Sequence, residues 1–215
     1  MVFEGIVKKL QDEKTSLPLN HYVERRAGIL PELGGIYAFW WKNETDEEKQ
    51  LLRSFNRRVF IKGKQIKPKR EEIPPEHIIH EVNWDWNLEE SFVCLYVGKA
   101  SNIAKRVKQH LGMGHGQNWY ELTNHANYKA SKAAKYKNGF LLKWDTACQL
   151  RAGMEHLLSS GDGTYQFKDA LQKNIYFSHF TDFDKDPHIA MTERFYSEDF
   201  AIGSLRPWFN VDSER

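Results

Sequence analysis

The chain has 215 residues, with 31 Lys and Arg against 29 Asp and Glu and a formal charge of +2. Its hydrophobic fraction of 40% and charged fraction of 28% are typical of a soluble globular protein, and so small a net charge does not by itself indicate a nucleic-acid partner. No apolar run approaches the roughly 18 residues of a membrane span, and the first residues lack the order of a signal peptide. We therefore expect a cytoplasmic protein with no membrane partner and a single domain over residues 1–215.

Helices and strands are predicted in alternation along the chain. Residues 1–16 carry apolar side chains at helical spacing and predict an N-terminal helix. Strands are predicted at residues 34–41, 57–63, 92–98, 139–145 and 174–180, and further helices at 101–111, from about 146 to 158, and at 186–207. This order predicts an α/β (α+β) fold in which a small mixed β-sheet is flanked by helices. Cys94 and Cys148 fall in predicted core elements, so both are expected to be reduced.

Two segments between the predicted core elements are rich in charge. Residues 42–90 hold 10 Lys and Arg and 11 Asp and Glu, which predicts a solvated insertion on the surface. Residues 99–143 hold nine Lys and Arg and one acid, interleaved with Trp and Tyr, and they overlap a second insertion at 112–172. Such a mixture can neutralise phosphates and stack on bases, although a merely solvated face has a similar composition.

The stretch LYVGKASNIAKRVKQHL, residues 95–111, runs from a buried strand through a glycine into a helix. The apolar positions of this helix repeat every four residues and are expected to face the sheet: Ile103, Val107 and Leu111. Arg106 and His110 lie one turn apart on a neighbouring stripe, where both can point at one small ligand.

A lysine and a capping residue stand at the start of the same helix. Lys99 is expected in the turn before it, and Ser101 or Asn102 is expected to cap it. Backbone N–H groups, a lysine and an arginine around one helix start favour an anionic ligand, and GKASN lacks the Walker pattern of a nucleotide-cradling loop. The expected anion is a phosphodiester, although solvated amphipathic helices often look the same.

Three separated motifs resemble those of the GIY-YIG nuclease family. GIY at 35–37 matches the first half of the family's name motif, and YVG at 96–98 matches the second half with valine in place of isoleucine. The stretch that begins YVGKA is similar to the nuclease domain of the bacterial repair excinuclease, including an arginine eight residues after the glycine. SEDFAIGSLRPWFNV, residues 197–211, resembles the family's last helix and tail, in which proline follows a glutamate by nine residues and asparagine follows it by twelve.

The resemblance implies a GIY-YIG nuclease core with large insertions that hydrolyses a DNA phosphodiester with the help of a metal ion. Glu198 would hold that ion, Mg²⁺ or Mn²⁺, and Arg106 would stabilise charge that builds on the phosphate. A motif tyrosine would activate the water, with Tyr37 preferred and Tyr96 as the alternative. The site implied by the resemblance is completed by Lys99, His110 and Asn210. Lys99 or His110 would assist the base, while Asn210 would orient backbone or phosphate or simply terminate the helix tail.

Other carboxylates and histidines are assigned no metal. Glu193 lies about 140° around its helix from Glu198, so it is expected to be a surface or ion-pair group. Four histidines lack a cysteine or third ligand at zinc-site spacing and are expected on the surface: His77, His80, His115 and His125.

Two departures from the family pattern bear on the biological role. Tyr37 and Tyr96 are 59 positions apart, so residues 42–90 must be inserted between adjacent strands, which loop-closure entropy tolerates. His110 stands where the excinuclease has tyrosine, and in this it resembles phage and restriction members of the family. We expect a site-specific type II restriction enzyme acting on double-stranded DNA, as a homodimer if its site is palindromic. A repair or homing nuclease and a non-catalytic nucleic-acid-binding module on the same fold are the alternatives.

Overall fold

The computed structural model describes residues 2–14, 19, 30–54, 58–60, 79–81, 89–110, 136–137, 140–141, 150 and 173–210. Its elements are α1 (Val2–Glu13), β1 (Gly35–Lys42), α3 (Asp46–Ser54), β2 (Arg58–Phe60), β3 (Ile79–Glu81), β4 (Phe92–Ala100), α4 (Ile103–His110), β5 (Tyr136–Lys137), β6 (Phe140–Leu141), β7 (Ile175–Phe180) and α9 (Pro187–Leu205). No helix within these ranges is long and apolar enough to cross a membrane.

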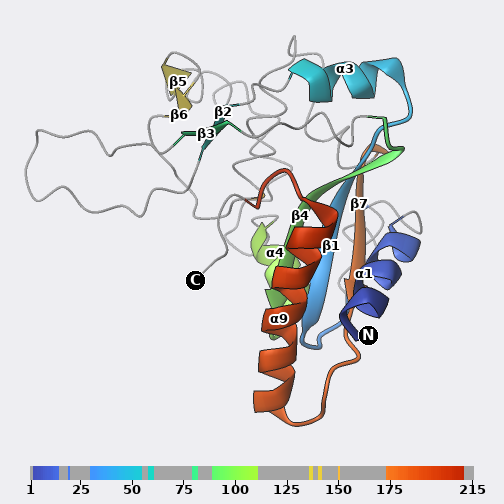
Figure 1. Cartoon of the computed structure of the whole chain (residues 1–215), viewed down its shortest axis with the longest axis vertical. Helices are drawn as coiled ribbons and strands as arrows, with labels where there is room; N and C mark the ends of the chain where they lie inside the picture. Colours follow the sequence, from blue (N-terminus) through green and yellow to red (C-terminus); the bar gives the residue numbers. More distant parts are fainter. Residues whose placement is uncertain are drawn as a thin grey trace, which may run out of the picture.

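A three-stranded sheet in the order β4-β1-β7 forms the body of the fold (Figure 1). Tyr37 of β1 pairs with Gly98 of β4 on one side and with His179 of β7 on the other, and both pairings are antiparallel. The α/β class is confirmed, but the prediction of a mixed sheet is wrong for the described strands. A parallel pair needs a crossover connection that returns the chain to the same end of the sheet. The long helix α9 follows the last strand of this sheet, so it supplies no such crossover.

Different helices cover the two faces of the sheet. Ile36, Ala38 and Trp40 share one hydrophobic core with residues of α1 and α9. Tyr37 points to the opposite face, where the ring of His110 from α4 packs against it. The figure accordingly shows α9 and α4 on opposite sides of β4 (Figure 1). Because both faces are covered, β1 is buried along nearly its whole length and its sequence is a continuous apolar run.

The chain that follows α9 covers the outer edge of β4. The backbone N–H groups of Trp208 and Phe209 donate to the carbonyl groups of Cys94 and Leu95, at 3.1 and 2.8 Å. An edge strand otherwise presents unpaired backbone groups, so this contact satisfies them and fixes α9 relative to β4.

Local sequence explains where two of the helices begin. The side chain of Asp186 accepts hydrogen bonds from the N–H groups two and three positions later, and Pro187 occupies the first helical position, where no N–H is needed. Asn102 caps α4 by accepting from the N–H of Lys105 at 2.8 Å. Both predicted starts are confirmed, and Asn102 rather than Ser101 is the cap of α4.

The first residues of the predicted surface insertion, 42–90, include a few buried polar groups that connect α3 to the residues before β7. Thr45 and Glu48 form a capping box at the start of α3, in which the Glu48 N–H donates to the Thr45 hydroxyl and the Glu48 carboxylate accepts from the Thr45 N–H. The other oxygen of Glu48 accepts from the side chain of Asn174, just before β7. Glu48 and Asn43 are both buried, whereas residues 44–47 between them are exposed.

Several predicted elements lie largely outside the described residues. Within the strands predicted at 57–63 and 139–145, the described residues form β2 and β6. The helix predicted from about 146 to 158 is described only at Leu150, and most of the 112–172 insertion is not described.

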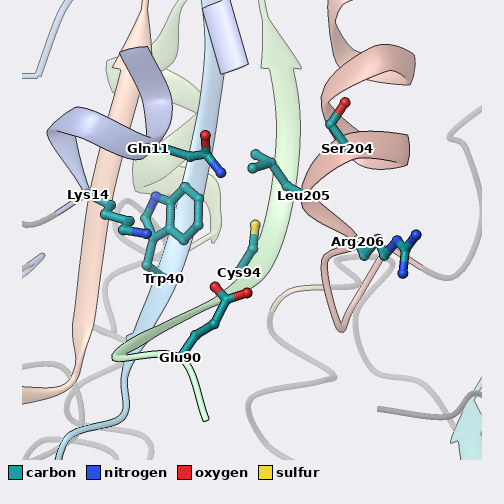
Figure 2. Close-up of a pocket in the computed structure, with 8 residues that line it drawn as sticks. All are labelled: Gln11, Lys14, Trp40, Glu90, Cys94, Ser204, Leu205 and Arg206. Carbon is teal, nitrogen blue, oxygen red and sulfur yellow. The ribbon is translucent and has the colours of Figure 1, made fainter. Parts of the chain in front are cut away.

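The face that holds Trp40 carries a small cavity between the ends of α1 and α9 (Figure 2). Its volume is about 220 Å³, and Lys14 lies over the Trp40 ring at its wall, 5.3 Å from the ring centroid. Cys94 lines it as a free, buried cysteine, as predicted, and burial raises the pKa of its thiol. None of the predicted site residues lines this cavity, so the candidate site lies elsewhere.

Candidate functional site

Three of the predicted site residues form one cluster on the α4 face of the sheet. The hydroxyl of Tyr37 lies 2.7 Å from Nε2 of His110, across 73 positions of sequence. Tyr96 packs against both, with ring centroids 6.3 Å from Tyr37 and 5.4 Å from His110. All three side chains are buried, at 0 to 2% exposed. If the hydroxyl donates, His110 is neutral and carries its proton on Nδ1. We call Tyr37, Tyr96 and His110 the tyrosine–histidine cluster.

Gly98 makes this packing possible. A Cβ at this position would lie 2.5 Å from the Tyr37 hydroxyl and 2.8 Å from Cε1 of Tyr96, closer than real Cβ contacts come. The glycine of the YVG motif is therefore explained by the approach of two aromatic rings to the backbone.

A second group forms where α9 meets the end of β4. One carboxylate oxygen of Glu198 accepts from the backbone N–H of Lys99 at 3.0 Å, and the other pairs with the ammonium of the same residue. The ammonium also lies 4.8 Å from the ring centroid of Phe195. Glu198 is 6% exposed, so its charge is largely removed from water and is balanced by Lys99. We call Lys99 and Glu198 the carboxylate–lysine pair.

Lys99 lies in β4 and not in the turn where it was predicted. The pairing with β1 continues past Gly98 to Ala100, which keeps Lys99 extended. Its side chain is 28% exposed.

The tyrosine–histidine cluster and the carboxylate–lysine pair meet at one peptide unit. The Tyr37 ring packs on Gly98, and Glu198 bonds to the N–H of the next residue, Lys99. Consecutive Cα atoms are about 3.8 Å apart, so the hydroxyl and the carboxylate approach one short stretch of β4. The hydroxyl comes from the α4 face, whereas the carboxylate comes from the outer edge, where the backbone groups of Val97 also point.

Of the remaining predicted residues, Asn210 contacts β4 next to this meeting point, and Arg106 lies on α4. Arg106 lies on α4 one turn before His110 and is half-buried. Asn210 holds the backbone of Val97: its Oδ1 accepts from the Val97 N–H and its Nδ2 donates to the Val97 carbonyl, each at 2.7 Å. Of its predicted roles, orienting the backbone is the one these contacts favour.

Replacing Asn210 with aspartate should lower the free energy of unfolding by about 1–3 kcal/mol. The carboxylate still accepts from Val97 but presents an oxygen to its carbonyl, which loses its donor. Urea unfolding followed by circular dichroism measures the change, and a midpoint equal to that of the original chain would contradict the assigned role.

Glu193 lies apart from the carboxylate–lysine pair. Its carboxylate accepts from the backbone N–H of Asp184 at 3.0 Å and so holds the loop before α9. Glu193 therefore contacts the loop before α9, whereas Glu198 contacts Lys99.

Glu198 is the carboxylate of the candidate site that could hold a cation. Among the described residues no three His, Cys, Asp or Glu side chains gather closely enough to hold a metal ion. Mg²⁺ commonly uses one or two carboxylates and keeps several waters, whereas zinc sites need three or four protein ligands. The partner of one Glu198 oxygen is the Lys99 ammonium, which a cation at this carboxylate would have to replace. His80 lies in β3, and the other three histidines of the predicted surface set fall outside the described residues.

Sequence reasoning missed His179. This residue lies opposite Tyr37 in the β1–β7 register, and its ring stacks on Phe177, which in turn stacks on Tyr37. Burial lowers the pKa of His179 below its usual value, with an opposing effect of Glu13 and a smaller lowering effect of Lys9, and this shift favours the neutral ring. The signal that could have identified His179 was a polar residue in the strand predicted at 174–180. The sequence did not show which face of the sheet His179 occupies, because that depends on how β7 pairs with β1.

Comparison of the chain with protein-family models, with curated proteins and with solved structures finds no match.

Proposed function

We propose that this chain is a metal-dependent endonuclease that hydrolyses phosphodiester bonds of double-stranded DNA. The observation that carries the proposal is the meeting of the tyrosine–histidine cluster and the carboxylate–lysine pair at Gly98 and Lys99. A phenol hydrogen-bonded to an imidazole, a carboxylate and a lysine are the groups that a hydrolytic site for phosphate requires. They come from four elements, β1, β4, α4 and α9, of which only β4 and α4 are neighbours in the sequence.

Each residue of the proposed site has a distinct part in the reaction. Glu198 would hold Mg²⁺ or Mn²⁺, which supplies positive charge to the phosphate oxygens when bound. Lys99 and Arg106 stabilise the negative charge that builds on the phosphate. Tyr37 passes its proton to Nε2 of His110 and accepts a proton from water. The water oxygen bonds to phosphorus, the bond to the leaving oxygen breaks, and that oxygen takes a proton from solvent.

A non-cutting DNA-binding module is the second candidate function, and the burial of Tyr37 favours it. The Tyr37 side chain is 0% exposed, so a phosphate reaches its hydroxyl only if the rings packed around Tyr37 move. A protein that kept this packing at all times could not use Tyr37 as a base, and DNA bound to it would stay uncut.

Incubation of the purified chain with supercoiled plasmid separates the two functions. With Mg²⁺ or Mn²⁺ we expect conversion to nicked and linear DNA, and excess EDTA should abolish it because the charge at Glu198 is then left without its cation. Plasmid that stays supercoiled with both metals, while its gel mobility shifts, would favour the binding module.

The ends of the cut DNA test the narrower role. A restriction enzyme, the role proposed here, produces ends with one shared sequence, whereas ends at many unrelated sequences would refute restriction and leave the nuclease chemistry in place. The alternative of a repair nuclease would show preference for damaged DNA instead.

A further inference from the structure

Lys99 contacts both oxygens of the Glu198 carboxylate. Its backbone N–H donates to Oε1 at 3.0 Å, and its ammonium pairs with Oε2. The two contacts differ in how firmly they are fixed. The N–H belongs to a residue of β4 that lies opposite Ile36 of β1, so it keeps its place while the sheet is intact. The ammonium ends a flexible side chain of four carbons, so it can move while the backbone stays.

Burial makes a cation at Oε2 necessary. Glu198 is 6% exposed, and a buried carboxylate that loses its partner is strongly disfavoured. The Lys99 ammonium supplies the balancing charge. The ring of Phe195, one turn before Glu198 on α9, adds a second attraction, with its centroid 4.8 Å from the ammonium nitrogen. The ammonium is therefore held at the carboxylate by two residues of the same helix.

A divalent cation and the Lys99 ammonium cannot both bind Oε2. Like charges a few ångström apart repel, and the repulsion is stronger where water is largely excluded. Each cation therefore binds at the expense of the other. The apparent affinity for a metal ion is then its intrinsic affinity multiplied by the fraction of molecules in which the ammonium has left the carboxylate.

We infer that Lys99 is an internal competitor of the metal ion, and that its ammonium occupies the Glu198 carboxylate until a divalent cation displaces it. Displacement exchanges one positive charge for another at Oε2, so the buried carboxylate stays balanced throughout. It also releases the ammonium for the part at the phosphate proposed above. This inference rests on the proposed function, in which Glu198 holds the cation.

Replacing Lys99 with methionine tests the competition, because methionine keeps an unbranched side chain and removes the ammonium. Binding of Mn²⁺ alone, without DNA, is measured from the electron paramagnetic resonance signal of the free ion. We expect Lys99→Met to bind Mn²⁺ about tenfold more tightly than the original chain, since a charge-assisted hydrogen bond no longer competes. Lys99→Arg should bind it no more tightly than the original, because a guanidinium still pairs with the carboxylate.

Two controls assign the gain in affinity to this carboxylate. Adding Glu198→Gln to Lys99→Met should abolish the tighter binding. Lys105→Met removes an exposed lysine of α4 and should bind Mn²⁺ as the original chain does.

Thermal melting gives a readout that does not depend on cleavage. Lys99→Met should melt at a lower temperature than the original chain when no metal is added, because the buried carboxylate has lost its cation. Mg²⁺ should raise the melting temperature of Lys99→Met more than that of the original chain, since a bound ion stabilises the folded state and supplies the missing charge.

A measurement on the original chain covers the case in which Lys99→Met does not fold. The nitrogen NMR resonance of the Lys99 ammonium is identified by its loss in Lys99→Arg. Its protons should exchange slowly with water without metal, and faster once Mg²⁺ displaces the ammonium from the carboxylate.

Equal or lower affinity of folded Lys99→Met for Mn²⁺, or an ammonium resonance that Mg²⁺ leaves unchanged, would overturn the inference. If the original chain leaves plasmid uncut while Lys99→Met gains affinity through Glu198, the nuclease proposal fails and the competition stands. If neither chain binds Mn²⁺ through Glu198, the inference and the metal assignment are both refuted.

Discussion

Replacing Glu198 with glutamine is expected to lower the rate of DNA cleavage by about 100-fold or more. Glutamine keeps an oxygen for the N–H of Lys99 but removes the charge that would hold the cation and that balances the Lys99 ammonium. Affinity for DNA without metal should be retained, because the change removes a negative charge near the phosphate. Single-turnover cleavage of plasmid in Mg²⁺ measures the rate, and anisotropy measures the affinity.

Glu193→Gln is the matched control for this variant. It makes the same chemical change on the same helix, at a carboxylate that contacts Asp184 instead of Lys99. We expect its cleavage rate to stay within about twofold of the original. Circular dichroism of Glu198→Gln confirms that the chain is folded, and a cleavage rate within tenfold of the original would remove Glu198 from the metal assignment.

Local signals in the sequence predicted most of the elements that hold the candidate site. The apolar run before Gly98 predicted β4, and the four-residue repeat after it predicted the face of α4 that Ile103 and Val107 bury. Proline and a capping carboxylate predicted the start of α9. These features depend on residues within one or two turns of each other, so a single sequence is enough to find them.

The contacts that complete the site depend on tertiary packing and were not predictable in the same way. Nothing local indicates that Glu198 meets the backbone of Lys99, 99 positions away, or that α9 and α4 lie on opposite faces of the sheet. The face of His179 required the register of β7 on β1. The capping box of Thr45 and Glu48 was readable from its spacing, but the buried side chain of Asn174 that Glu48 binds was not.

Replacing Gly98 with alanine should lower the free energy of unfolding by about 1–3 kcal/mol and reduce cleavage at least about tenfold. The new methyl group would lie 2.5 Å from the Tyr37 hydroxyl and 2.6 Å from Cζ of the same ring. Tyr37 and Tyr96 are both buried, so neither ring can swing into solvent. The Tyr37 hydroxyl must then move away from His110. The same displacement therefore lowers both the stability and the cleavage rate. Urea unfolding and plasmid cleavage measure the two effects.

Gly203→Ala is the control that separates this clash from the general effect of adding a methyl group. A Cβ at Gly203 meets nothing within 4 Å, and alanine favours a helix over glycine, so this variant should gain about 0.5–1 kcal/mol. Adding Tyr37→Phe to Gly98→Ala removes the nearest clashing atom but leaves Cζ, so stability should recover only in part. Cleavage should not recover, because the proposed base is gone. Unchanged stability of Gly98→Ala would mean that the two tyrosine rings do not pack on β4 as described.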